Sequence, residues 1–262
     1  MIYGHRGARE LFPENTLEGI KSIVKLPING VEIDVLVSGD KQLIVSHNPF
    51  AHPFFCLDAK GKEIEANDDN HNFFKMDHSK IQSYDVGLKK HPEFLDQKKY
   101  PAKIPLLSEV FDLLNNEVTT SFSLFLEIKS DQNRVGEFYP KAEEYAMLVD
   151  SFLNENEFKG QLIVKSFDHL FLNEFYRLSK NKYRLGLLVD NQYSVRENLS
   201  QLDFVPAYYN PEYIHVTKQM VEELHHREIQ LVTWTVNEIV DYEQMIYLNV
   251  DGIISDHPMR FI

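Results

Sequence analysis

Short runs of apolar and β-branched residues alternate along this chain with segments in which apolar residues recur at helical spacing. Such alternation is typical of βα units that build a parallel sheet. The predicted strands are Ile2 to His5, Val31 to Val37, Phe122 to Lys129, Gln161 to Ser166, Arg184 to Val189, Phe204 to Tyr208, Gln230 to Val236 and Gly252 to Ser255.

The helical pattern fills the intervals between these strands. Seven helices between eight strands is the count for an α/β barrel of the TIM type, (β/α)8, that closes on itself. A chain of 262 residues is large enough for such a barrel as one unit, so we expect a single domain over residues 1–262. The predicted helices are Thr16 to Lys25, Leu107 to Asn115, Ala142 to Asn154, Asp168 to Leu178, Ser194 to Leu199, Lys218 to His226 and Ile239 to Tyr247.

Two segments depart from a plain βα repeat. After the second strand, turn residues and then Gln42 to His47 predict a hairpin with a returning strand. A two-residue loop at Gly39 and Asp40 would place Glu32 opposite His47, whereas a slip of one residue would turn His47 to the other face. Residues 49–105 then show no clean period. Plain βα loops are far shorter, so this segment is predicted to be an insertion beside the site, as a lid or specificity element.

Composition narrows the classes of partner. The chain has 27 basic and 40 acidic residues. The resulting net charge of -13 repels nucleic acid and anionic membranes. A phosphate-bearing substrate would therefore need a local cation. The single cysteine, Cys56, excludes an internal disulfide, and neither a signal peptide nor a membrane-length apolar run is visible. We expect a cytoplasmic protein without stable membrane association. Its oligomeric state is not indicated.

Three carboxylates suggest a metal site. Glu32 and Asp34 are two positions apart on one strand, so both side chains leave the same face. Glu127 closes a later strand and could be the third ligand, with Lys129 on the same face. Carboxylate oxygens suit Mg²⁺ or Ca²⁺. A solvated strand face is the alternative, but the apolar neighbours favour burial, and buried carboxylates need a partner.

The end of the first strand offers acid/base and phosphate-binding groups. His5 is followed by Arg6, a bidentate phosphate ligand by geometry, and by Gly7, which lets the backbone approach closely. His47 also ends a strand. Two histidines can serve as base and acid at neutral pH, although a single histidine is more often structural or exposed.

The residues after this strand end allow two interpretations. Glu14 could face the site, or its segment could simply start the first helix with Asn15 or Thr16 as the cap. Trp234, the only tryptophan, is either core or an apolar wall near a small alcohol. Asp256, after the last strand, is predicted to cap a helix turn or orient a ligand.

With these residues assembled, the sequence resembles the glycerophosphodiester phosphodiesterase family. The resemblance rests on the motifs GHRG, PENT, EIDV, the SH turn at Ser46 and His47, LEIK, VKSFD, TWTVN and DGIISD, in family order from residue 2 to residue 258. It implies a TIM-type barrel with an extra segment after the second strand. It also implies hydrolysis of glycerophosphodiesters to glycerol 3-phosphate and an alcohol.

Position by position, the resemblance implies a role for each candidate. It makes His5 and His47 the acid/base pair, Glu32, Asp34 and Glu127 the ligands of a divalent cation, Arg6 and Lys129 phosphate contacts, and Trp234 the wall near the glycerol. Attack by the glycerol hydroxyl, through a cyclic phosphate, and direct attack by water both remain open. Two departures from the family are visible. Asn48 stands where the family usually has aspartate, which leaves open any ligand or orienting role of that carboxylate but not the general reaction. The family's Arg-Thr-Thr stretch is also absent, which leaves the substrate preference open.

Two competing interpretations use the same residues. A sphingomyelinase D-like phospholipase shares the barrel but acts on lipids at membranes, and the acidic charge, the missing signal peptide and the single cysteine count against it. A non-catalytic module with a decayed site is the other, and Asn48 is its best support.

Overall fold

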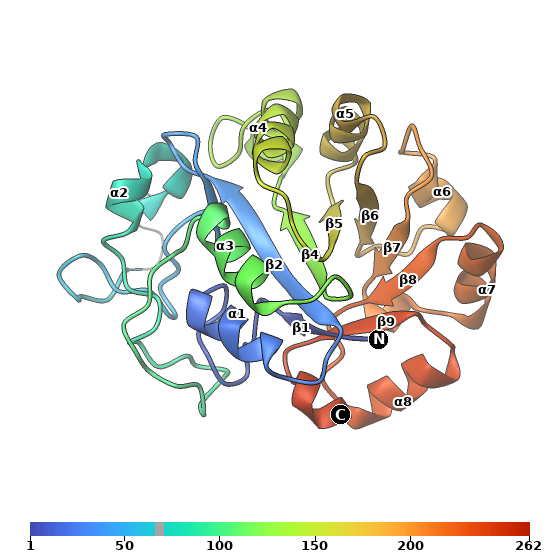
Figure 1. Cartoon of the computed structure of the whole chain (residues 1–262), viewed down its shortest axis with the longest axis horizontal. Helices are drawn as coiled ribbons and strands as arrows, with labels where there is room; N and C mark the ends of the chain where they lie inside the picture. Colours follow the sequence, from blue (N-terminus) through green and yellow to red (C-terminus); the bar gives the residue numbers. More distant parts are fainter. Residues whose placement is uncertain (66–70) are drawn as a thin grey trace.

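The computed structural model, which describes residues 1–65 and 71–262, is built on a closed barrel of eight parallel strands surrounded by helices (Figure 1). The strands follow chain order around the barrel, and β1 pairs with both β2 and β9, which closes it. The predicted TIM-type barrel is confirmed. Its strands are β1 (Ile2–His5), β2 (Gly30–Val37), β4 (Ser123–Ile128), β5 (Gln161–Ser166), β6 (Arg184–Val189), β7 (Tyr208–Pro211), β8 (Gln230–Thr233) and β9 (Gly252–Ser255).

Helices cover the outside of the barrel because one face of each carries the apolar residues that pack against the strands. The α-helices around the barrel are α1 (Leu17–Val24), α3 (Leu107–Glu117), α4 (Ala142–Glu155), α5 (His169–Ser179), α6 (Val195–Leu199), α7 (Lys218–His226) and α8 (Ile239–Tyr247), and the short α2 (His78–Ile81) lies in the segment after the hairpin. Short 3-10 helices are η2 (Phe73–Lys75), η3 (Gln132–Arg134), η4 (Tyr213–His215) and η5 (Pro258–Phe261). Within the described residues, no helix is long and apolar enough to cross a membrane.

One predicted strand is displaced. The prediction was Phe204 to Tyr208, but β7 is Tyr208–Pro211, which pairs with β6 from Gly186 onward. The apolar run that suggested the earlier start lies in a loop, where Phe204 stacks on Tyr176 and Val205 is 75% exposed. Apolar residues there cover a helix and face solvent instead of joining the sheet.

The predicted register of the hairpin is also wrong. β3 (Leu43–Val45) runs antiparallel to β2, with Val35 opposite Val45 and Val37 opposite Leu43. The turn therefore contains three residues between Ser38 and Gln42. The backbone N–H of Ser38 donates to the carbonyl oxygen of Gln42 at 3.0 Å. Lys41 in this turn has φ 62, a left-handed conformation that accommodates the extra residue. The ladder consequently ends before His47, which is not opposite Glu32.

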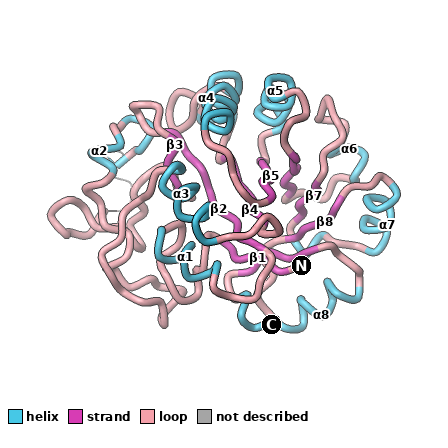
Figure 2. Tube along the Cα trace, viewed as in Figure 1, coloured by secondary structure: helices cyan, strands magenta, loops and turns pink. Residues whose placement is uncertain are grey.

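Residues 49–65 and 71–105 follow the hairpin and are mostly loop, with η2 and α2 as their helical turns (Figure 2). Residues 66–70 of the predicted insertion lie outside the described residues. The segment has an apolar cluster of its own, which includes Phe73 and Ile81 and packs on Leu36 and Ile44 of the hairpin. It also reaches the β1–α1 loop, where Tyr100 Oη lies 3.0 Å from Thr16 Oγ1.

The barrel interior is closed by a layer of apolar side chains below the carboxyl ends of the strands. Six strands contribute to it, and their inward side chains are all at most 2% exposed. This layer consists of Tyr3, Phe125, Ile163, Tyr208, Val232 and Ile254. Because side chains alternate along a strand, the residue two positions later on each strand must face the same interior, one layer nearer the mouth.

Candidate active site

Mostly polar side chains form that next layer. Each stands two positions after a residue of the apolar layer, so the barrel geometry gathers groups that are far apart in sequence. These side chains are His5, Glu127, Lys165, Asn210, Trp234 and Asp256. The carboxyl ends of barrel strands are where TIM-barrel enzymes carry their active sites.

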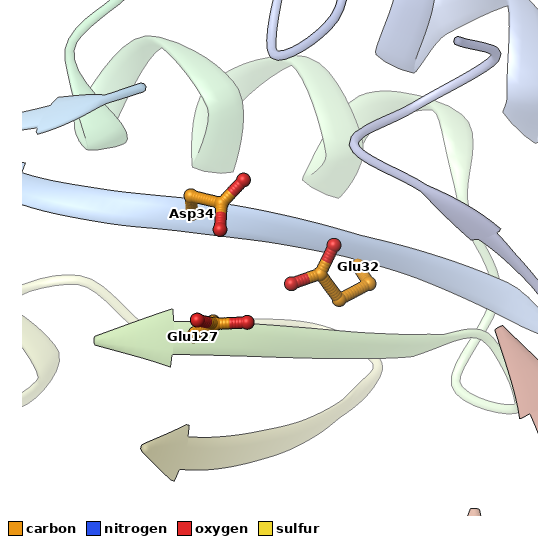
Figure 3. A group of neighbouring side chains, drawn as sticks. All are labelled: Glu32, Asp34 and Glu127. Atoms are coloured by element: carbon orange, nitrogen blue, oxygen red, sulfur yellow. The ribbon is translucent and has the colours of Figure 1, made fainter. Parts of the chain in front are cut away.

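The predicted acidic residues converge at this layer. Glu32 and Asp34 project from β2 toward Glu127 on the neighbouring β4 (Figure 3), and the register places Asp34 beside Glu127. One carboxylate oxygen from each lies within 4.8 Å of the other two. Glu32 and Asp34 are each 1% exposed, which excludes the solvated strand face considered above.

The three carboxylates form a site that suits a hard divalent cation. Glu32 Oε1 and Asp34 Oδ1 are buried and accept no hydrogen bond from the described chain. Buried charged oxygens without a donor are costly, and a cation bound by all three carboxylates would satisfy them. The donor set contains only oxygen, which fits Mg²⁺ or Ca²⁺.

The pKa values of the carboxyl groups reflect this crowding. Burial raises the pKa of Glu32, and Lys165 offsets the effect of burial only in part, because Asp34 and Glu127 add to it. Burial would also raise the pKa of Asp34, but Arg6 and other nearby charges hold it well below its usual range. The cluster therefore retains negative charge that a cation could balance.

Arg6 connects the loop after β1 to the acidic residues. Its Nη1 donates to Glu14 Oε1 at 2.9 Å, its Nε lies 3.3 Å from Asp34 Oδ2, and its backbone N–H donates to Glu32 Oε2 at 3.3 Å. Arg9 Nε donates to the other oxygen of Glu14 at 2.6 Å. Burial works against ionisation of Glu14, but the two guanidinium groups lower its pKa to about 2. Glu14 is thus an ionised anchor that fixes Arg6.

Neighbouring residues of the PENT segment, residues 13–16, have different roles. Thr16, not Asn15, caps α1, with its Oγ1 accepting from Gly19 N at 3.2 Å. Asn15 turns into the site, where its Nδ2 donates to Asp34 Oδ2 at 2.9 Å. From the sequence, Asn15 was predicted only as a possible cap, because asparagine and threonine are both good capping residues.

The side chain of His5 is held by a carboxylate that directly follows the last strand, β9. Its Nδ1 lies 2.7 Å from Asp256 Oδ1, and its Nε2 lies 3.9 Å from Glu32 Oε2 and 3.2 Å from Arg6 Nε. A carboxylate on one ring nitrogen orients the imidazole and fixes which nitrogen faces the site. Asp256 therefore orients His5, whereas the sequence predicted that it caps a helix turn or orients a ligand.

His47 reaches the same cluster by a different route from the predicted ladder. The strand before it ends at Val45, and Ser46 N donates to Asp34 O at 3.0 Å, which leads the chain toward the site. Burial lowers the pKa of His47 to about 4, while the nearby charge of Asp34 acts to raise it. Asn48 Oδ1 lies 3.3 Å from His47 Nδ1, so an amide is next to this ring.

Lys129 and Trp234 form the mouth of the site. Lys129 Nζ donates to Glu127 Oε1 at 2.7 Å and lies 3.8 Å from Asp34 Oδ1. Burial would lower the pKa of Lys129, but these two carboxylates raise it. Trp234, partly buried after β8, contacts Phe167 edge to face at 5.5 Å between ring centroids. The Lys129 ammonium group thus borders the acidic residues, and the Phe167 ring lies near both this ammonium group and Trp234.

Beyond Lys129 a groove of about 990 Å³ extends over the ends of β4, β5 and β6. Phe167, Asp168 and Tyr193 contribute to its lining. A groove of this size can hold a small organic ligand. It is continuous with the mouth of the site because Lys129 borders both.

The fold and these side chains together define a class of protein. A TIM barrel whose mouth combines three buried carboxylates, an arginine, a lysine and two histidines can bind a phosphate ester through a cation and move protons around it. Within the described residues, this is the only group of three such ligands close enough to hold a metal ion.

Comparison with known proteins specifies the class further. Residues 5–260 match the model of the glycerophosphoryl diester phosphodiesterase family. A glycerophosphodiester phosphodiesterase from Caldanaerobacter subterraneus subsp. tengcongensis is 28% identical over 264 residues, which cover 100% of this chain and 96% of that protein. The chain belongs to this family and is a phosphoric diester hydrolase of the glycerophosphodiester class. The resemblance seen in the sequence is confirmed.

Solved structures agree on the fold. A protein from Silicibacter pomeroyi DSS-3 assigned to the same class superposes with a TM-score of 0.87 at 26% identity, covering 99% of this chain and 90% of that one. A phosphodiesterase from Oleispira antarctica, solved with its product sn-glycerol-3-phosphate, gives a TM-score of 0.79 at 21% identity, with coverage of 99% and 94%.

Proposed function

We propose that this chain hydrolyses glycerophosphodiesters to glycerol 3-phosphate and an alcohol, with Mg²⁺ or Ca²⁺ held by Glu32, Asp34 and Glu127. The observation that carries the proposal is the buried carboxylate group with two oxygens that lack donors, beside Arg6 and Lys129. When bound, such a cation would neutralise the phosphate and stabilise the charge that develops during hydrolysis.

Arg6 and Lys129 are proposed as the phosphate contacts. Arg6 is fixed by Glu14 and offers a guanidinium that matches two phosphate oxygens. Lys129 adds a second positive charge from the adjacent side of the acidic residues. Both groups are preorganised by ion pairs, so little reorganisation is needed when a phosphate binds.

His5 and His47 are proposed as the acid/base pair. His5 is suited to accept a proton because Asp256 holds its Nδ1 and would stabilise the imidazolium that forms. His47 would supply the proton to the leaving alkoxide. A histidine whose pKa is lowered to about 4 is a strong acid once it has been protonated.

The remaining predicted residues surround this centre. Trp234 is proposed as the apolar wall beside the glycerol, and Glu14 as the group that positions Arg6. Residues 49–105 are proposed as an insertion within one barrel domain of residues 1–262, acting as a lid or specificity element. The contact of Gln97 Nε2 with Arg9 O at 2.7 Å supports a connection between this segment and the site.

The partner is proposed to be a small molecule, without nucleic acid or stable membrane association. The net charge of -13 supports this because it repels polyanions outside the local cations of the site. A cytoplasmic location is proposed with it, and the single cysteine, which is buried, fits a reducing compartment.

A substrate panel tests the function. Glycerophosphocholine, glycerophosphoethanolamine and glycerophosphoglycerol are incubated with the protein and Mg²⁺ or Ca²⁺, and glycerol 3-phosphate is measured with a coupled dehydrogenase. We expect release from at least one diester. Glu127→Gln should lose it, and Glu144→Gln, a surface carboxylate paired with Lys41, should retain it. Turnover only of lipid in vesicles would contradict the proposed substrate class.

A further inference from the structure

Lys165 is a buried cation that the proposed reaction does not use. It stands on β5 beside Glu127, its partner in the parallel register, and is 2% exposed. Lysine is almost never buried without a charged partner. The chemistry around its ammonium group therefore indicates what this side chain does.

The carboxylates that pair with Lys165 are two of the three proposed metal ligands. Its Nζ lies 3.5 Å from Glu32 Oε1 and 3.9 Å from Glu127 Oε2, and it donates no hydrogen bond to a side chain or backbone group of the described residues. The ring of Phe125 lies beneath it, with its centroid 5.9 Å from Nζ. The positive charge is therefore enclosed between the acidic residues and the apolar layer.

The barrel leaves space for this side chain on the neighbouring strand. Gly186 on β6 stands beside Lys165, and a Cβ at that position would lie 3.2 Å from Lys165 Cβ and 2.7 Å from Asn210 Oδ1. Any larger residue would crowd both groups. The inner layer of the barrel thus accommodates the lysine at this level.

Lys165 differs from Lys129 in the exposure of its side chain. The Lys129 side chain is 17% exposed, borders the groove, and can meet a substrate from the mouth. The Lys165 side chain is 2% exposed and lies beside Glu32 and Glu127. The structure therefore separates a lysine that borders the groove from one that is enclosed beside two of the proposed metal ligands.

We propose that Lys165 is the internal counter-ion of the Glu32, Asp34 and Glu127 site and sets its affinity for a divalent cation. This proposal rests on the metal site of the proposed function. The ammonium group balances part of the carboxylate charge when no cation is bound, and it repels a bound cation across a few ångströms of low-dielectric interior. Lys165 is thus a positioning residue that stabilises the protein without metal and weakens metal binding.

Titration of the protein with MgCl₂ or CaCl₂ without substrate tests this inference. Calorimetry gives the dissociation constant, and thermal unfolding gives the stability at each metal concentration. Lys165→Met, which removes the charge at similar length, should bind the cation about 10-fold or more tightly and unfold at a lower temperature without it. Lys165→Arg, which keeps the charge, should bind close to the wild-type affinity.

The outcomes separate this inference from the metal site itself. If the wild-type protein binds the cation and Lys165→Met binds it no more tightly, the counter-ion role is wrong and the metal site stands. If the wild-type protein does not bind the cation, or if Glu127→Gln binds it as tightly as the wild type does, the metal site is wrong and the inference falls with it. Lys165→Gln serves if Lys165→Met is insoluble. If added metal makes either variant soluble and folded, the proposal is supported. If both variants remain insoluble with metal present, the proposal is overturned.

Discussion

The imidazole Nδ1 of His5 lies 2.7 Å from Asp256 Oδ1, so the first and last strands of the barrel jointly build the proposed proton-transfer group. β1 and β9 pair in parallel, with Gly4 opposite Ser255. The two residues that follow this pair therefore emerge together at the mouth. Closure of the barrel is what brings the histidine and its carboxylate into contact.

We expect Asp256→Asn to lower kcat by about 100-fold with a smaller change in KM, because the amide cannot stabilise the imidazolium of His5. Asp251→Asn is the matched control, since Asp251 accepts from His225 at 3.0 Å but lies before β9, at the other end of the strand. Steady-state kinetics on the best diester measures both variants. Equal kcat values for Asp256→Asn and the wild type would remove Asp256 from the proton-transfer group.

The sequence predicts much of the barrel because strands buried on both faces read as short apolar runs. β5, β6 and β9 have the predicted bounds, as do α7 and α8. The predicted range of β7 is wrong because Phe204 and Val205 are apolar but lie outside the sheet, Phe204 against Tyr176 and Val205 in solvent. Composition alone cannot show whether an apolar run joins a sheet or covers a helix.

Only some of the residues of the site can be predicted from the sequence. Glu32 and Asp34 are visible because carboxylates are unusual in an apolar strand. Lys165 stays hidden because its proximity to Glu127 depends on the β4–β5 register, which no local pattern gives. The hairpin shows the same limit, since one additional turn residue changes every pairing after it.

Removal of either histidine tests the acid/base assignment. We expect His5→Ala and His47→Ala each to lower kcat by about 100-fold or more, because general acid/base catalysis contributes rate factors of this size. His226→Ala, an exposed residue at the end of α7, is the control and should leave kcat unchanged. Near-wild-type turnover in both site variants would refute the pair.

Chelation tests the divalent cation. We expect EDTA to abolish turnover and to lower the unfolding temperature, because Glu32 and Asp34 would then hold buried oxygens without any donor. Addition of Mg²⁺ or Ca²⁺ in excess should restore both. Differential scanning fluorimetry and the coupled assay are run on the same samples. Full activity after exhaustive chelation would exclude a metal from the mechanism.

The residue beside His47 offers a gain-of-charge test. Asn48→Asp would place a carboxylate next to Nδ1, now 3.3 Å from Asn48 Oδ1, and raise the pKa of His47 above its present value of about 4. A group whose pKa rises is protonated to a larger extent at any pH between the new value and neutrality. Because His47 is proposed to donate its proton, kcat at pH 6 to 7 should rise.

NMR titration of the His47 ring protons and a pH profile of kcat measure the two effects separately. Asn116→Asp, an exposed position on α3, controls for the added negative charge of the whole protein and should change neither quantity. A raised His47 pKa with a lower kcat would reverse its role, making His47 the proton acceptor. An unchanged pKa would show that the side chain at position 48 does not act on the His47 ring in solution.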